Sequence, residues 1–205
     1  MIPTIKDTPY VGEFEWHYRT TNAWGEEVTG DVKGVIARDS SGRSVQQYDS
    51  NPFCGLVASV MSIILDPVTQ MLHVVDRESS TTVVSSSVPI GLSSAPVPID
   101  GVGVTSPTLF GDPGPNDTFI GEEVIEGMNC RGYRRLGRRI QEIEIEFWVA
   151  DELQDTLLAR VSAGGFESSF RVHNIRKTEP NPELLAIPVL EETDGDGIDF
   201  HFAPL

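Results

Sequence analysis

The chain is a succession of short segments in which apolar and polar residues alternate, and this pattern limits its fold more than any other feature. The clearest example is EIEIEF at 142–147, where an extended strand would place three carboxylates on one side and three apolar side chains on the other. Helical periodicity is nearly absent: only 151–161 could form a helix, and its flanks favour a turn followed by a strand. The pattern is typical of an antiparallel sheet with one solvated face.

Eleven segments of this kind are bounded by Gly, Asp, Ser or Pro, and they predict strands. Short connections between them favour antiparallel neighbours over βαβ crossovers. After Asp66, for example, Pro67 fixes a turn and cannot donate to a sheet ladder, so one strand ends there. The predicted strands lie at 13–20, 27–38, 44–48, 59–66, 71–76, 81–86, 119–125, 130–136, 142–149, 157–162 and 166–177.

Length and charge indicate one acidic domain. At 205 residues the chain suits a single antiparallel β domain, expected over 1–190, followed by an acidic tail at 191–205. No apolar run approaches the roughly 20 residues of a transmembrane helix, so we expect the chain not to span a membrane. The net charge of −16 repels phosphate backbones, so we expect no nucleic acid partner. The first residues lack a signal peptide pattern, which suits a mature exported protein and a cytosolic one equally.

Residues 85–116 differ from the rest of the chain because they are rich in Ser, Pro and Gly. A loop of this length is uncommon inside a compact domain and is usually functional or disordered. Its scattered apolar residues, among them Ile90, Leu109 and Phe110, suggest that it packs against something rather than acting as a linker. We therefore expect a long Pro/Ser-rich flap across the open face of the sheet.

Five arginines surround the turn at Gly137 and stand opposite the glutamates of 142–147. Cross-strand Arg–Glu pairs would fix the strand register, and each would contribute about 0.2–1 kcal/mol. We prefer this structural role to anion binding. The arginines are Arg131, Arg134, Arg135, Arg138 and Arg139.

Motifs of the common enzyme classes are missing from the sequence. It contains no GxSxG elbow, no HExxH motif, no phosphate-binding glycine loop and no dinucleotide fingerprint. Cys54 and Cys130 could form one disulfide or remain two buried thiols, and the sequence leaves both open. The histidines are isolated in strand-like segments, which favours structural or surface roles over metal binding. They are His17, His73, His173 and His201.

The acidic tail superficially resembles a calcium loop through Asp194, Asp196 and Asp199. An EF-hand loop needs Glu at its twelfth position, where this chain has Ala203, and it needs flanking helices. A solvated tail is therefore favoured over a calcium site. We expect no catalytic residue, no metal and no cofactor.

Several motifs, in the same order and with similar spacing over roughly residues 28–190, resemble those of uncharacterised exported bacterial proteins of the kind found in Acidobacteria-like genomes. The motifs are RDSSGR at 38–43, ILDP at 64–67, MLHVVD at 71–76, the glycines at 121, 127 and 132 with Ile125 and Arg134, the segment EFWVADEL at 146–153, NI at 174–175, EPNPELL at 179–185 and IP at 187–188. Leu185 stands where the family tends to have Phe.

The sheet of that family is similar to the half-barrel of the LolA/LolB lipoprotein carriers and the RseB/MucB regulators. The resemblance implies a mainly β fold with one large, strongly curved antiparallel sheet and little helix. It also implies a periplasmic or secreted location, and it supplies no catalytic residues.

Three functions are compatible with the sequence. The first is a non-enzymatic envelope protein that binds a lipid or other apolar ligand, or a protein partner, in the concave face of the sheet. The second is a hydrolase or metal-dependent enzyme that uses strand histidines and carboxylates near the flap. The third is an assembly subunit that uses open β-edges, and the oligomeric state is left open. We rank them in this order, with candidate ligand-binding residues Trp148, Phe147, Phe110, Leu109 and Ile90.

Overall fold

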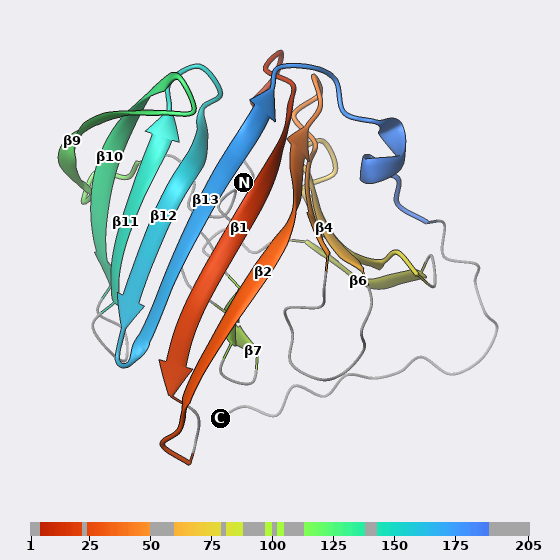
Figure 1. Ribbon diagram of the computed structural model, residues 1–205. Coiled ribbons are helices and arrows are strands. Elements are labelled where there is room, and N and C mark those ends of the chain that lie inside the picture. Colours follow the sequence, from red (N-terminus) through yellow and green to blue (C-terminus); the bar gives the residue numbers. More distant parts are fainter. Residues whose placement is uncertain are drawn as a thin grey trace.

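The computed structural model describes residues 5–21, 24–49, 60–78, 81–87, 97–99, 102–104, 113–137 and 143–188. Side chains are described in all of these ranges except 81–87, 97–99 and 102–104. The described residues contain one eleven-stranded antiparallel sheet, one two-stranded sheet and one short 3-10 helix (Figure 1). Most of the predicted flap at 85–116 and all of the tail at 191–205 lie outside the described residues.

The strands of the large sheet follow the order β6-β5-β4-β3-β2-β1-β13-β12-β11-β10-β9. Their bounds are β1 (Tyr10–Thr21), β2 (Glu27–Arg38), β3 (Ser44–Tyr48), β4 (Met61–Asp66), β5 (Met71–Asp76), β6 (Thr81–Ser87), β9 (Thr118–Ile125), β10 (Met128–Gly137), β11 (Ile143–Ala150), β12 (Asp155–Ala163) and β13 (Phe166–Arg176). The small sheet pairs β7 (Val97–Ile99) with β8 (Val102–Val104), and the 3-10 helix is η2 (Pro182–Leu185).

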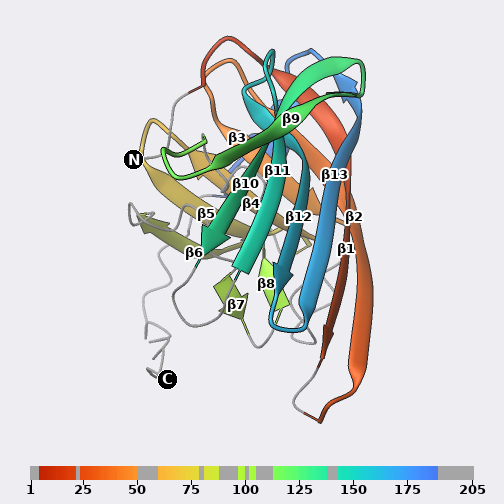
Figure 2. The ribbon, with the colours of Figure 1, turned by 90° about the vertical axis from the view of Figure 1, so that its left-hand side faces the viewer.

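The large sheet is strongly curved but not closed into a barrel. Strands β13, β1 and β2 form its centre, and β9–β12 and β3–β6 form two wings that bend to the same side (Figures 1 and 2). The edge strands β6 and β9 do not pair with each other. We name the side toward which the wings bend the inner face, and the opposite side the outer face. The inner face carries most of the apolar core, which is one continuous cluster from β1 to β13.

The eleven predicted strands are the eleven strands of the large sheet. The hairpin at Pro67 is confirmed: β4 ends at Asp66, whose carboxylate accepts hydrogen bonds from the backbone N–H groups of Val68 and Thr69 at 2.8 and 3.2 Å. The ambiguous segment 151–161 is a turn followed by β12, as expected. The short strands β7 and β8 were not predicted, because they lie inside the Pro/Ser-rich segment.

In the β3–β6 wing, the outer face of β3, β4 and β5 is covered by the chain after β13. Leu185 of η2 packs with Val45 and Ile64 in a second, smaller apolar cluster. Arg77 holds this segment on the sheet through hydrogen bonds. Its guanidinium donates to the carbonyl oxygens of Leu184 and Ala186 at 2.6 and 2.9 Å. The outer face of this wing is therefore a closed core, unlike the outer face of the centre.

A buried polar network joins the two halves of the chain. Arg38 at the end of β2 pairs with Asp155 at the start of β12 at 3.2 Å, and their side chains are 3% and 6% exposed. The Tyr10 hydroxyl donates to the same Asp155 oxygen at 2.7 Å, and the Thr156 backbone N–H donates to the other at 2.8 Å. Burial raises the pKa of Asp155, although Arg38 and these hydrogen bonds act in the opposite direction. The network fixes β2 relative to β12 across the strands between them.

Candidate functional site

A row of apolar side chains crosses the inner face from one wing to the centre. Cross-strand register aligns seven residues from seven neighbouring strands, and five of the seven are aromatic. The row is Phe119, Tyr133, Phe147, Ala159, Phe170, Trp16 and Val32, taken from β9 to β2. The inner face of the sheet is therefore apolar and continuous.

The rings in and next to this row are in contact. The centroid of the Tyr133 ring lies 6.0 Å from that of Phe119 and 5.8 Å from that of Phe147. At the centre of the sheet, the Phe14 ring stacks on Phe170 at 5.4 Å and meets Tyr48 edge-on at 5.3 Å. Such aromatic pairs contribute about 0.5–1.5 kcal/mol beyond their buried area.

Gly34 makes room for one of these rings. A Cβ atom at Gly34 would lie 2.8 Å from two atoms of the Phe14 ring and 2.0 Å from the Gln47 carbonyl oxygen. Only a residue without a side chain fits there, and so the Phe14 ring can lie across β2 to reach Tyr48. A glycine in the middle of a strand often marks such a close approach.

Charged groups on the inner face are paired with one another. Arg135 donates to both oxygens of Asp117, at 2.8 and 2.6 Å, and its guanidinium lies 5.0 Å from the centre of the Phe147 ring. Burial alone would raise the pKa of Asp117, but hydrogen bonds from Arg135 and from the Gly114 backbone outweigh it, and the pKa is lowered. Arg38 and Asp155 form a second pair, which is more deeply buried.

Two buried nitrogen atoms among the described side chains have no hydrogen-bond partner: Trp16 Nε1 and Gln46 Nε2. Trp16 is 1% exposed and Gln46 is 2% exposed. Gln46 has a partner only on its other side, where the Tyr48 hydroxyl donates to its Oε1 at 3.1 Å. Leaving a buried donor without an acceptor costs about 1–3 kcal/mol, so these two groups call for an explanation.

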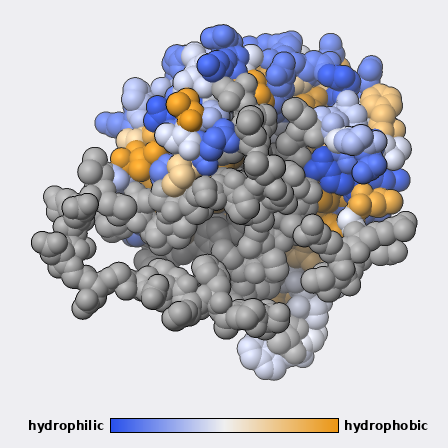
Figure 3. Space-filling model, turned by 180° about the vertical axis from the view of Figure 1, so that it is seen from behind, coloured by the Kyte–Doolittle hydropathy of each residue, from blue (hydrophilic) through white to orange (hydrophobic). Residues whose placement is uncertain are grey.

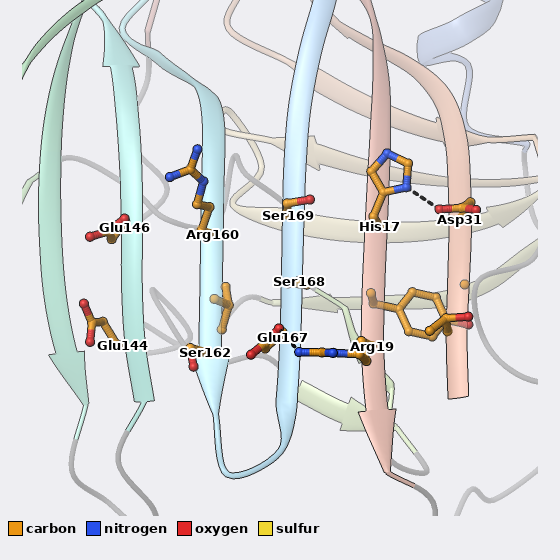
Figure 4. Close-up of a pocket in the computed structure, with 14 residues that line it drawn as sticks. His17, Arg19, Asp31, Glu144, Glu146, Arg160, Ser162, Glu167, Ser168 and Ser169 are labelled. Carbon is orange, nitrogen blue, oxygen red and sulfur yellow. Dashed lines mark hydrogen bonds and ion pairs between the residues drawn. The ribbon is translucent and has the colours of Figure 1, made fainter. Parts of the chain in front are cut away.

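The outer face of the centre is polar and contains a groove of about 650 Å³ (Figure 4). Apart from Ser168, which is on the same side of β13 as Phe170, the side chains labelled there project from the outer side of β11, β12, β13, β1 and β2. Most of its charges compensate one another across strands: Arg19 pairs with Glu167 at 2.6 Å, and His17 pairs with Asp31. Arg134 beside the groove pairs with Glu144 and Glu146, which confirms the predicted cross-strand register.

Two other arginines of the predicted cluster do not pair with glutamates. Arg131 pairs with Asp151 at 2.6 Å, and Arg135 turns to the inner face to pair with Asp117. The reason is alternation: Arg134 lies on the glutamate-bearing side of β10, and Arg135 lies on the opposite side. Arg138 and Arg139 lie outside the described residues.

The outer groove places Ser169, His17 and Asp31 side by side in register on β13, β1 and β2. A hydrolytic triad needs a hydrogen bond between serine and histidine and backbone N–H groups free to stabilise an oxyanion. His17 bonds Asp31, but no hydrogen bond joins it to Ser169, and the backbone N–H groups of central strands serve the sheet ladder. The row is therefore a set of surface pairs rather than a catalytic centre.

Metal binding finds no support among the described residues, which contain no group of three or more His, Cys, Asp and Glu side chains arranged to hold an ion. His17 and His173 each lie beside a carboxylate on the outer face, Asp31 and Glu13 respectively. Asp194, Asp196 and Asp199 lie outside the described residues. The preference for a solvated tail over a calcium site there stays a prediction.

Cys130 is a free thiol in the structure. Its side chain is 1% exposed, and burial raises its pKa to about 11. Cys54 lies outside the described residues. Cys130 therefore matches the buried-thiol alternative, with low nucleophilic reactivity at neutral pH.

The predicted ligand-binding residues are separated by the structure. Phe147 and Trp148 are neighbours on β11 and point to opposite faces, Phe147 into the inner aromatic row and Trp148 toward the outer face, where the Arg160 guanidinium lies 5.5 Å from its ring. Ile90, Leu109 and Phe110 lie outside the described residues. Of the five, Phe147 is the one that the structure places in the inner row.

Sequence reasoning missed Trp16 and Phe170, which occupy the centre of the row. The signal was present, because Phe14, Trp16 and Tyr18 alternate along one strand. Gln46 could not have been found in this way, because a glutamine in a strand gives no sign of its burial.

No protein-family model matches the sequence, and no curated protein matches it. Solved structures of similar shape include an uncharacterised conserved protein of Thermus thermophilus, with 8% identity, a TM-score of 0.48, and coverage of 87% of this chain and 83% of that one. A LolA superfamily protein of Nitrosomonas europaea has 8% identity, a TM-score of 0.40 and coverage of 89% and 92%. LprF of Mycobacterium bovis has 11% identity, a TM-score of 0.36 and coverage of 86% and 90%.

The second of these structures is named as a LolA superfamily protein, the type of sheet that the sequence resemblance implies. The relation to Acidobacteria-like proteins stays a prediction.

Proposed function

We propose that this chain is a non-enzymatic binding protein that holds an apolar or amphipathic ligand against the inner face of its curved sheet. The observation that carries the proposal is the aromatic row, which runs in register over seven strands. An apolar sheet face must be buried against another layer, and the one helix among the described residues, η2, packs on the outer face. The centre of the row is already buried, so a bound apolar molecule would take the place of part of this layer.

The row has a shape that suits an elongated apolar group. Ala159 ends at its Cβ atom and lies between Phe147 and Phe170, so the inner surface is lower there than on either side. Each methylene that a ligand buries against such a surface contributes about 0.8 kcal/mol. Because the row residues at the centre are almost fully buried, we propose that the ligand replaces what packs against them rather than filling an open cleft.

The rim of the inner side offers both kinds of surface that an amphipathic molecule needs. Seen from behind, orange hydrophobic residues lie among blue hydrophilic ones around the inner side (Figure 3). Phe119, the row residue on the edge strand β9, is 54% exposed. A ligand would first meet the protein there.

We also propose an envelope location, periplasmic or secreted. Its support is the sequence resemblance to exported bacterial proteins. None of the helices in the described part of the chain is long and apolar enough to cross a membrane. A protein that carries a lipid or another apolar molecule through an aqueous compartment would fit this location.

Binding of the apolar dye N-phenylnaphthylamine to the full chain tests the proposal. We expect a saturable rise in dye fluorescence at a stoichiometry near one. Phe147→Leu, which shortens the inner row, should weaken binding by several-fold, whereas Trp148→Phe on the opposite face of the same strand should leave it unchanged. Both variants must first show wild-type circular dichroism. Non-saturable binding, or equal effects of the two variants, would overturn the proposal.

A further inference from the structure

We infer that Trp16 and Gln46 recognise neutral acceptor oxygens of the ligand, such as the carbonyl oxygens of esters or amides. This inference rests on the proposed function, because it concerns the same inner face. Its starting point is the pair of unpartnered donors, Trp16 Nε1 and Gln46 Nε2. Both side chains are more than nine-tenths buried, so bulk water does not satisfy them.

The chemistry of the two groups defines what they would bind. The indole nitrogen is a donor only, so Trp16 needs an acceptor. The Gln46 carboxamide already uses its oxygen to accept from Tyr48, which leaves its NH₂ group as the free side. The two groups therefore bind acceptor atoms of a ligand, and they provide no acceptor for a hydrogen-bond donor of the ligand.

The surroundings favour a neutral acceptor over a carboxylate. Among the described residues, Arg38 and Arg135 on the inner face have carboxylate partners, Asp155 and Asp117 respectively. An anion beside Trp16 or Gln46 would thus be buried without a cation of its own, which is far more costly than burying a hydrogen-bonded carbonyl group. Esters and amides meet the requirement, and free fatty acids in their ionised form do not.

The spacing of the two donors indicates a ligand with more than one acceptor. Gln46 pairs with Ile36 on β2, and Trp16 pairs with Val32, so the two lie two strands and four residues apart. In a flat sheet this separation is roughly 16 Å between Cα atoms. The Phe14–Tyr48 contact lies between them. A single ester or amide group cannot span this separation, so each donor would need an acceptor of its own, with the apolar chains of the ligand on the aromatic row.

Competition for the dye-bound full chain tests the inference with dioctanoylglycerol, which has two ester groups, and with ionised dodecanoate. The wild type should bind the diester more tightly than the carboxylate. Trp16→Phe and Gln46→Met should each weaken diester binding by about 3- to 10-fold, the loss of one hydrogen bond. Gln46→Met, which lies outside the aromatic row, should leave dye affinity within about 2-fold. The matched control is Gln47→Met, a neighbour that points to the other face of β3, and it should change neither.

The outcomes separate the two proposals. If both variants retain wild-type affinity for the diester while the dye still binds, the two donors do not recognise the ligand and the inference fails alone. If the wild type binds neither dye nor diester, the proposed function fails with it. An independent readout in the wild type is the NMR signal of the Trp16 indole N–H, which should shift downfield when the diester is added. An unchanged signal at saturation would show that water or the chain itself holds this donor and would overturn the inference.

Discussion

Breaking the buried pair of Arg38 and Asp155 should be among the most destabilising single changes in this protein. Asp155→Ala leaves the Arg38 charge buried at 3% exposure, with the carbonyl oxygens of Thr8 and Leu153 and the Thr8 hydroxyl as its remaining partners. It also removes the acceptor of the Tyr10 hydroxyl. Loss of one partner from such a pair costs about 3–5 kcal/mol, against a total stability of about 5–15 kcal/mol for a domain.

A double-mutant cycle measures the coupling between Arg38 and Asp155. Arg38→Met removes the other charge, and the double variant Arg38→Met/Asp155→Ala leaves no unpaired charge. Its loss of stability should therefore be smaller than the sum of the two single losses by at least about 2 kcal/mol. The free energy of unfolding, measured by urea titration followed by circular dichroism, provides all four values. Additive losses, or single losses below about 1 kcal/mol, would refute the reasoning.

An exposed pair serves as the control for this cycle. Arg19 and Glu167 are 2.6 Å apart, and their side chains are 52% and 58% exposed. Exposed pairs contribute little because water screens the charges and the side chains lose freedom. Glu167→Ala should therefore leave the urea midpoint of unfolding almost unchanged.

Three further predictions concern single positions. Gly34→Ala forces a Cβ against the Phe14 ring and the strand beside it and should lower the unfolding free energy by about 1–3 kcal/mol or more, whereas Gly137→Ala meets nothing closer than 3.6 Å and should change it by less than about 1 kcal/mol. The folded-state pKa of Asp117 is lowered, so its contribution is present above the unfolded pKa of about 3.9 and is lost as pH falls through the folded pKa; Asp117→Asn should flatten the acid side of the stability profile, and an unchanged profile would contradict this. The Cys130 thiol, buried and with a pKa near 11, should react with iodoacetamide at pH 8 far more slowly than in urea-unfolded protein, as measured by peptide mapping, and equal rates would show that it is accessible.

Strand positions could be predicted because they depend on local signals. Alternation along each segment and breakers such as Pro67 identify where strands begin and end, and all eleven strands of the large sheet follow from them. The turn at 151–154 was likewise predictable from its flanks. Each of these signals extends over only a few neighbouring residues, so it can be recognised in a single sequence.

The inner site could be predicted only in part, because it depends on contacts between distant residues. Arg38 looks like the first residue of an exposed hairpin motif, and its burial follows from a partner 117 positions away. Phe147 and Trp148 look alike in sequence, and only the register of β11 with its neighbours shows that they serve opposite faces. Gln46 carries no local sign that one of its donors is buried without an acceptor.

Native mass spectrometry of the full chain, purified from its source without detergent, shows whether the protein carries an apolar ligand. We expect a population with one bound molecule, which organic extraction releases and which fragments as an apolar chain attached to a neutral ester or amide. The same chain, stripped and incubated with dioctanoylglycerol, should regain one equivalent. A mass equal to that of the polypeptide alone, before and after this incubation, would contradict the account.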